Sequence, residues 1–211
     1  MGVYAKNVAS FIEASLAVLP VLTIEKRPAV HGWQNATLAK SLAWAKQEKL
    51  GAADGLGVLL GEKSRIVEID VDAVGSAWVG AAMMRFGETP VAIRTASGKA
   101  KLWYRYTSER RRIRPFANIP IDVLGKGFTI APPSVRQDLR TNYEFLSGGL
   151  NETADLPCLK PGSLDSLQSP ETTIPGLRNT RLWRWSMMEA RSCDDVEALI
   201  DAAKTYNQAY P

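Results

Sequence analysis

The chain has 211 residues, of which 45% are hydrophobic and 23% charged, and its formal net charge is +4. That length suits one substantial domain with a small appendage. No apolar stretch approaches the length of a membrane span, and the first residues lack the pattern of a secretory signal. The two cysteines, Cys158 and Cys193, lack metal-ligand spacing, so we expect a reduced, cytoplasmic protein.

The spacing of apolar residues predicts an alternation of helices and strands. Thr37 is typical of a helix N-cap. The strands at 57–61 and 65–72 are separated by a short turn, so we expect them to form a hairpin. In chain order, the predicted elements are a helix at 5–19, a strand at 21–24, a helix at 38–49, strands at 57–61 and 65–72, a helix at 75–86, and strands at 91–95, 101–106, 119–123, 127–131 and 143–146.

The C-terminal part of the chain differs in composition from the rest. Residues 151–176 are rich in Pro, Ser, Thr and Gly, which is typical of a linker, and a helical pattern returns from 177 onward. We therefore predict a main domain over 1–165, a linker over 166–176 and a small helical domain over 177–211.

The strand at 65–72 carries acidic residues at every second position. Because successive side chains of a strand point to opposite faces, its valines and isoleucine should face a core while Asp70 and Asp72 share the other face. Two carboxylates held in this way suit a pair of divalent cations, and they repel each other without a cation nearby. A third acid, Asp122, ends a later apolar strand.

Two basic segments lie between the acidic strands. The first, residues 95–101, contains Ser97 and Gly98, which allow close approach of a phosphate, and Lys99 and Lys101, which supply charge. The second combines arginines with aromatic residues, as a surface for a nucleic acid backbone does, although a solvated loop has the same composition. Its arginines are Arg105, Arg110, Arg111, Arg112 and Arg114.

The order of these motifs, an acidic pair, a Ser-Gly loop with a basic residue, a third acid and then Pro132-Pro133-Ser134, resembles the archaeo-eukaryotic primase superfamily. More narrowly, it resembles the bifunctional primase-polymerase N-terminal domains of plasmids and phages, over roughly residues 5–150. The resemblance implies an α/β (α+β) fold with a mostly antiparallel catalytic sheet flanked by helices, followed by a small C-terminal helical bundle.

The resemblance also implies an activity, template-dependent nucleotidyl transfer on single-stranded DNA by a DNA primase/polymerase. Asp70, Asp72 and Asp122 would bind two Mg²⁺ or Mn²⁺ ions. The loop from Ser97 to Lys101 would bind the nucleoside triphosphate through either lysine, and Ser134 and Arg136 would touch the nucleotide or the template. The chain has no Walker-type motif, so any helicase would act in trans.

Two positions depart from the family pattern. Lys101 replaces the histidine that contacts nucleotide phosphates, and the chain's single histidine, His31, lies in an unrelated loop. Glu68 replaces an apolar residue. It is a potential metal ligand or partner of Lys99 or Lys101, but we expect it at the exposed rim of the sheet. The missing histidine supports an alternative, a non-catalytic factor that binds nucleotides or single-stranded DNA. A metal-dependent nuclease using the same acids is a third reading.

Overall fold

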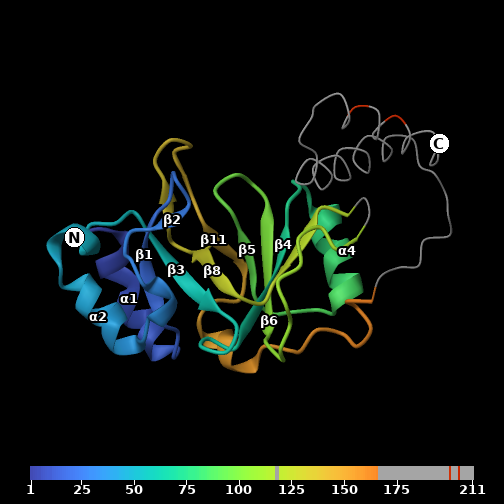
Figure 1. Ribbon diagram of the computed structural model, residues 1–211, viewed down its shortest axis with the longest axis horizontal. Coiled ribbons are helices and arrows are strands. Elements are labelled where there is room, and N and C mark those ends of the chain that lie inside the picture. The colour runs from blue at the N-terminus through green and yellow to red at the C-terminus, as the bar shows by residue number, and fades with distance from the viewer. Residues whose placement is uncertain (117–118, 166–199, 201–203, 205–211) are drawn as a thin grey trace. The chain divides into compact units, whose positions relative to one another are not determined.

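The structure is a computed structural model that describes residues 1–116, 119–165, 200 and 204 (Figure 1). The chain divides into two compact units, Met1–Ser166 and Leu167–Pro211. The predicted linker and C-terminal helices fall almost entirely outside the described residues, so they stay predictions. Among the described helices, none is long and apolar enough to cross a membrane.

The first sheet of the larger unit is antiparallel, with the strand order β2-β1-β3-β8. Three helices accompany it. Tyr4 of α1 is fully buried, and its hydroxyl donates to the carbonyls of Val18 in β1, at 3.2 Å, and Ser41 in α2, at 3.0 Å. The elements are α1 (Val3–Glu13), β1 (Val18–Leu22), β2 (Arg27–Pro28), α2 (Leu38–Ala45), α3 (Glu48–Gly51), β3 (Gly55–Leu60) and β8 (Gly127–Ala131).

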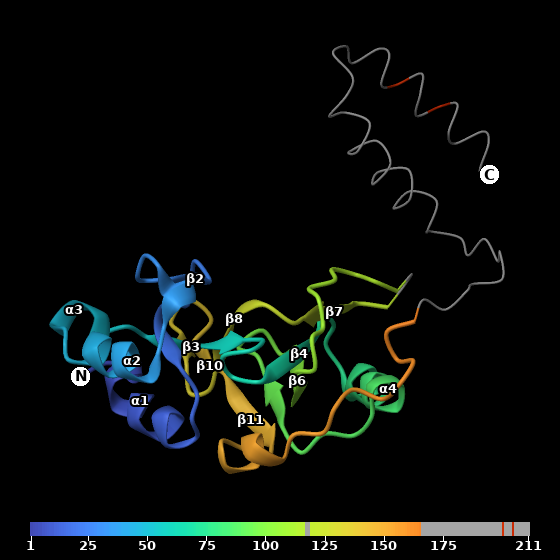
Figure 2. The same ribbon diagram turned by 60° about the horizontal axis from the view of Figure 1, so that its bottom comes forward.

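The second sheet is also antiparallel and has the order β11-β5-β6-β4-β7. Its strands are β4 (Ile66–Val71), β5 (Ala92–Arg94), β6 (Ala100–Arg105), β7 (Ile121–Leu124) and β11 (Glu144–Ser147). The helix α4 (Ser76–Phe86) covers one face, where Phe86 shares a hydrophobic cluster with Val67, Ile69 and Val71. This burial confirms the predicted inward face of the acidic strand. Both views place α1 and α2 at one end and α4 at the other, with the sheets between them (Figures 1 and 2).

The predicted hairpin of the strands at 57–61 and 65–72 is wrong. β3 and β4 belong to different sheets, and only an isolated bridge between Gly61 and Ile66 joins them. The reason is that each strand already has partners along both edges: β3 pairs with β1 and β8, and β4 pairs with β6 and β7. Neither strand has an edge left for the other.

The other elements predicted before residue 147 are found, the strand at 127–131 with its predicted bounds and the rest with shifted ones. The first helix ends at Glu13 rather than at residue 19, because the chain turns at Ser15, which has a φ of 59°. Thr37 caps α2 as predicted, its side chain accepting a hydrogen bond from the Lys40 amide, but a break after Ala45 separates α2 from α3. The pattern did not predict five short elements: β2, η1 (Trp33–Asn35), β9 (Val135–Arg136), β10 (Thr141–Asn142) and η2 (Asn151–Asp155). β9 and β10 pair with each other in a small separate sheet.

Candidate active site

The three predicted aspartates gather on two neighbouring strands of the second sheet. Asp70 in β4 stands opposite Asp122 in β7, and its neighbour on the other side is Lys101 in β6. Asp72 comes directly after β4, where its amide donates to the carbonyl of Pro120 at 2.7 Å. We call Asp70, Asp72 and Asp122 the acidic cluster. Antiparallel pairing therefore unites acids that lie fifty residues apart in the sequence.

Two cations hold the carboxylate of Asp72. Lys99 pairs with Oδ1, and Arg114 pairs with Oδ2. The hydrogen bond from Lys99 and the nearby charges of Arg114 and Lys26 keep the pKa of Asp72 below its ordinary value. Lys26 lies in the β1–β2 turn and Lys99 in the β5–β6 turn, and both turns project to the same side of the unit (Figure 1).

Arg114 also contacts Asp122. Its backbone amide donates to Oδ1 of Asp122 at 2.7 Å, and its Nε lies 3.8 Å from the same oxygen. The segment is held against β7 by two backbone hydrogen bonds between Arg112 and Val123, of 2.8 and 2.9 Å. Sequence reasoning placed Arg114 with the DNA-binding arginines and missed its contact with the acids. Only the pairing of residue 112 with residue 123 brings it there, and no local pattern reveals that pairing.

Asp70 has a different environment. Burial, reinforced by the negative charge of Glu68, raises its pKa to about 6. Among the described residues, none donates a hydrogen bond to this carboxylate or forms an ion pair with it within 4 Å. A partly buried carboxylate in this state is stabilised by a cation placed beside it.

The expectation that Glu68 lies at an exposed rim is wrong. Glu68 is fully buried between the two sheets, and its Oε1 lies 3.4 Å from Nζ of Lys101. Thr129 in β8 and the indole of Trp103 each donate a hydrogen bond to its carboxylate at 2.9 Å. Burial alone would lower the pKa of Lys101, but the charges of Glu68 and Asp70 hold it above its ordinary value. Charge pairing and two donors make this burial tolerable.

The structure separates the two lysines that the sequence left as equivalent phosphate ligands. Lys99 is partly exposed and pairs with Asp72, whereas Lys101 points inward and donates to the Thr129 hydroxyl. Ser97 and Gly98 are exposed at the tip of the β5–β6 turn, where Gly98 has a φ of 80° that favours glycine.

Ser134 and Arg136, which were predicted to touch the nucleotide or the template, contact other parts of the protein. Ser134 is fully buried; its hydroxyl accepts from the Leu56 amide at 2.9 Å and donates to the Ala131 carbonyl at 2.6 Å. That hydroxyl is thus engaged with the backbone around β3. The guanidinium of Arg136 pairs with Asp138 through hydrogen bonds of 2.8 and 2.6 Å.

The other predicted DNA-binding arginines lie outside the acidic cluster. Arg110, Arg111 and Arg112 are exposed, and Arg112 donates to the carbonyl of Leu164 at 3.0 Å. Arg114 is the member of this group that reaches the aspartates.

The donor chemistry of the acidic cluster fits a hard divalent cation. Carboxylate oxygens are the ligands that Mg²⁺ and Mn²⁺ prefer. Among the described residues, no three His, Cys, Asp or Glu side chains are grouped closely enough to hold a metal ion. Asp70 and Asp122 face each other across the strand pair, while the oxygens of Asp72 point to Lys99 and Arg114. A metal at these carboxylates would therefore compete with Lys99 and Arg114 for Asp72, and with Arg114 for Asp122.

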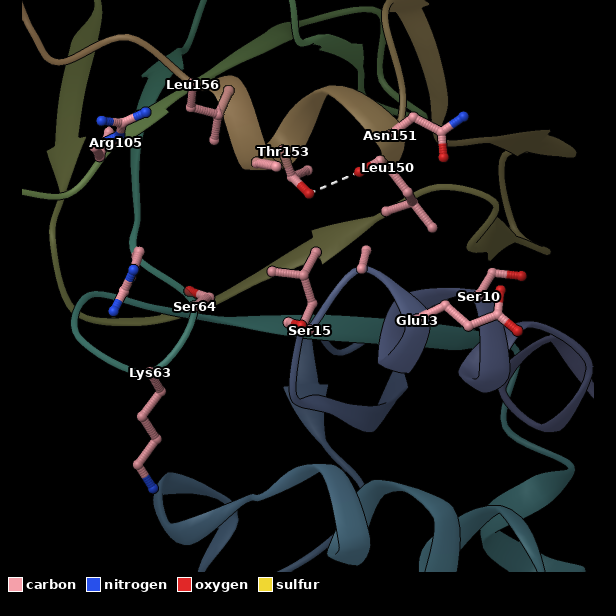
Figure 3. Close-up of a pocket in the computed structure, with 14 residues that line it drawn as sticks. Ser10, Glu13, Ser15, Lys63, Ser64, Arg105, Leu150, Asn151, Thr153 and Leu156 are labelled. Atoms are coloured by element: carbon pink, nitrogen blue, oxygen red, sulfur yellow. Dashed lines mark hydrogen bonds between the residues drawn. The ribbon is translucent and has the colours of Figure 1, made fainter.

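A cavity of about 1090 Å³ lies at the opposite end of β4 (Figure 3). Arg65 lines it just before the strand begins, seven residues and roughly 23 Å along the chain from Asp72. Lys63 extends away from the cavity and donates to the carbonyl of Gln34 at 2.8 Å (Figure 3). No member of the acidic cluster lines this cavity, so it is a separate feature.

Comparison with known families supports the expected relationship. A family model described as bifunctional DNA primase/polymerase, N-terminal, matches residues 9–159, which is more than half of the chain. None of the curated proteins compared with the chain matches it. The matched region contains both sheets and every member of the acidic cluster. The chain therefore belongs to the family of bifunctional DNA primase/polymerase N-terminal domains.

Proposed function

We propose that the chain is a template-dependent nucleotidyltransferase that acts on single-stranded DNA. Family membership implies an activity of the nucleotidyltransferase type. The observation that carries the proposal is the cross-strand pair of Asp70 and Asp122, with Asp72 at the end of the same strand. Acids on a rigid sheet suit phosphoryl transfer, because catalysis there depends on positioning and on charge stabilisation.

The three residues of the acidic cluster, Asp70, Asp72 and Asp122, would hold Mg²⁺ or Mn²⁺. When bound, the metal supplies stabilisation of the negative charge that develops on the transferred phosphate. Lys99 and Arg114, beside Asp72, supply positive charge for a triphosphate. The exposed arginines from Arg110 to Arg112 suit the backbone of a template strand.

A second candidate function is binding of nucleotides or single-stranded DNA without catalysis. It is favoured by two observations. Both oxygens of Asp72 are held by cations, and Lys101, which replaces the family histidine, is engaged with Glu68. A role in plasmid or phage replication and a helicase acting in trans stay predictions.

Primer extension distinguishes the two functions. The assay uses a labelled primer on a single-stranded DNA template, deoxynucleotides or ribonucleotides, and Mg²⁺ or Mn²⁺. We expect template-dependent extension that falls at least about a hundredfold in the double variant Asp70→Ala/Asp72→Ala. The matched control is Asp155→Ala, which removes an exposed acid in η2. Nucleotide or DNA binding without synthesis under any of these conditions would establish the second function instead.

A further inference from the structure

The cations beside Asp72 occupy both of its oxygens. Lys99 takes Oδ1 and Arg114 takes Oδ2, and Arg114 reaches Asp122 as well through its amide and its Nε. The side chains of Arg114 and Asp72 are 33% and 34% exposed, so this ion pair lies at the surface of the site. Arg114 is therefore positioned where an incoming ligand meets the carboxylates.

The charges around the acidic cluster balance. Four carboxylates face four cations, which leaves no net charge; the groups are Glu68, Asp70, Asp72 and Asp122 against Lys26, Lys99, Lys101 and Arg114. Two divalent cations and a nucleoside triphosphate, which carries about four negative charges, would leave that balance unchanged. Binding of metal and triphosphate therefore leaves the net charge of the site unchanged, while the cations already in the site can exchange one anionic partner for another.

We propose that Arg114 is an exchangeable counter-ion: it neutralises Asp72 and Asp122 in the unloaded site and transfers to the phosphates of the nucleoside triphosphate when this binds with divalent metal. This inference rests on the proposed function. A guanidinium suits the role, because its planar array of donors matches carboxylate and phosphate oxygens equally well.

The backbone around Arg114 allows this exchange without a loop movement. The two hydrogen bonds between Arg112 and Val123 hold the segment to β7, and the Arg114 amide holds Asp122 at 2.7 Å. Only the side chain, a third of which is exposed, has to turn from one set of oxygens to another. Metal without nucleotide competes with Arg114 for Asp72, whereas metal with nucleotide gives the arginine a new partner. Mn²⁺ and nucleotide should therefore strengthen each other's binding.

Equilibrium titrations test this inference without any turnover. Mn²⁺ alone, and then dATP in the presence of Mn²⁺, are titrated into the full chain and into Arg114→Gln. We expect Arg114→Gln to bind Mn²⁺ alone about fivefold more tightly and dATP about fivefold more weakly than the original chain. The matched control is Arg65→Gln, an exposed arginine at the opposite end of β4, which should change neither affinity. Arg114→Lys retains the positive charge, so its affinities for Mn²⁺ and for dATP should lie between those of the original chain and those of Arg114→Gln.

Opposite changes in the two affinities are the signature of an exchange. If Arg114→Gln weakens Mn²⁺ binding or leaves it unchanged, or leaves dATP binding unchanged, Arg114 is a fixed structural clamp and the inference is wrong. If Arg114→Gln does not fold, Arg114→Lys decides by the same two affinities. Failure of the original chain to bind Mn²⁺ or dATP would instead remove the proposed function on which the inference rests.

Discussion

Glu68 and Lys101 meet between the two sheets, where almost no solvent reaches them. Removing one partner leaves an uncompensated buried charge. We therefore expect Glu68→Leu to lower the free energy of unfolding by about 3–5 kcal/mol, measured by urea denaturation. The double variant Glu68→Leu/Lys101→Met removes both charges and should cost less than the single variant, because an ion pair can often be replaced by apolar side chains of similar size.

An exposed ion pair provides the comparison for the buried pair of Glu68 and Lys101. Arg94 and Glu144 pair across β5 and β11, with side chains 54% and 36% exposed. Glu144→Gln should cost less than about 1 kcal/mol. If the costs of Glu68→Leu and Lys101→Met simply add in the double variant, the two side chains do not depend on each other and the pair is not a unit.

Asp70 predicts a pH dependence of stability. Its pKa is raised from 3.8 to about 6 in the folded protein, so the folded state holds a proton more tightly than the unfolded state. Stability must then fall as pH rises from about 4 to 6, and the loss persists above that range. Asp70→Asn removes this loss, and we expect its advantage over the original chain to grow by about 2 kcal/mol between pH 4 and 7, in metal-free buffer.

Asp72 should show the opposite sign. Lys99, Arg114 and Lys26 lower its pKa, so its ionised form adds stability above the ordinary titration range and loses this contribution as pH falls. Asp72→Asn should be less stable than the original chain at pH 7, and the difference should vanish on acidification. Urea denaturation of the three proteins across pH 3–8 measures both effects. Parallel pH profiles for Asp70→Asn and Asp72→Asn would contradict the contrast between their environments.

β4 shows how far the sequence alone predicts the site. The alternation of apolar and acidic residues predicts a strand at 65–72, one residue longer at each end than β4, and correctly predicts the inward face formed by Val67, Ile69 and Val71, because side-chain direction in a strand is a local property. The partners of the strand are not local. β3 was expected beside β4 because the two are adjacent in sequence, yet β6 and β7 take both edges of β4.

Charged side chains show the same division between local and long-range information. From the sequence, Glu68 is expected at the rim of the sheet because a carboxylate alone is costly to bury. Its burial depends on long-range partners, which are Lys101 and Trp103 in β6 and Thr129 in β8. The sequence gives no sign that Arg114 differs from the other arginines of its basic segment. Its role at the acidic cluster follows from the pairing of residue 112 with residue 123, which composition and periodicity do not encode.

The larger unit contains every contact described for the site. Both sheets, the acidic cluster, Lys99 and Arg114 lie within Met1–Ser166, and the family match ends at residue 159. The chain shortened to residues 1–165 should therefore fold alone, with a melting temperature within a few degrees of the full chain and the same Mn²⁺ affinity. Circular dichroism and Mn²⁺ titration measure these quantities. In the shortened chain, Glu68→Leu should lower the free energy of unfolding by about 3–5 kcal/mol, as in the full chain, because the partners of Glu68 remain. A shortened chain that fails to fold, or that binds Mn²⁺ differently, would contradict this prediction.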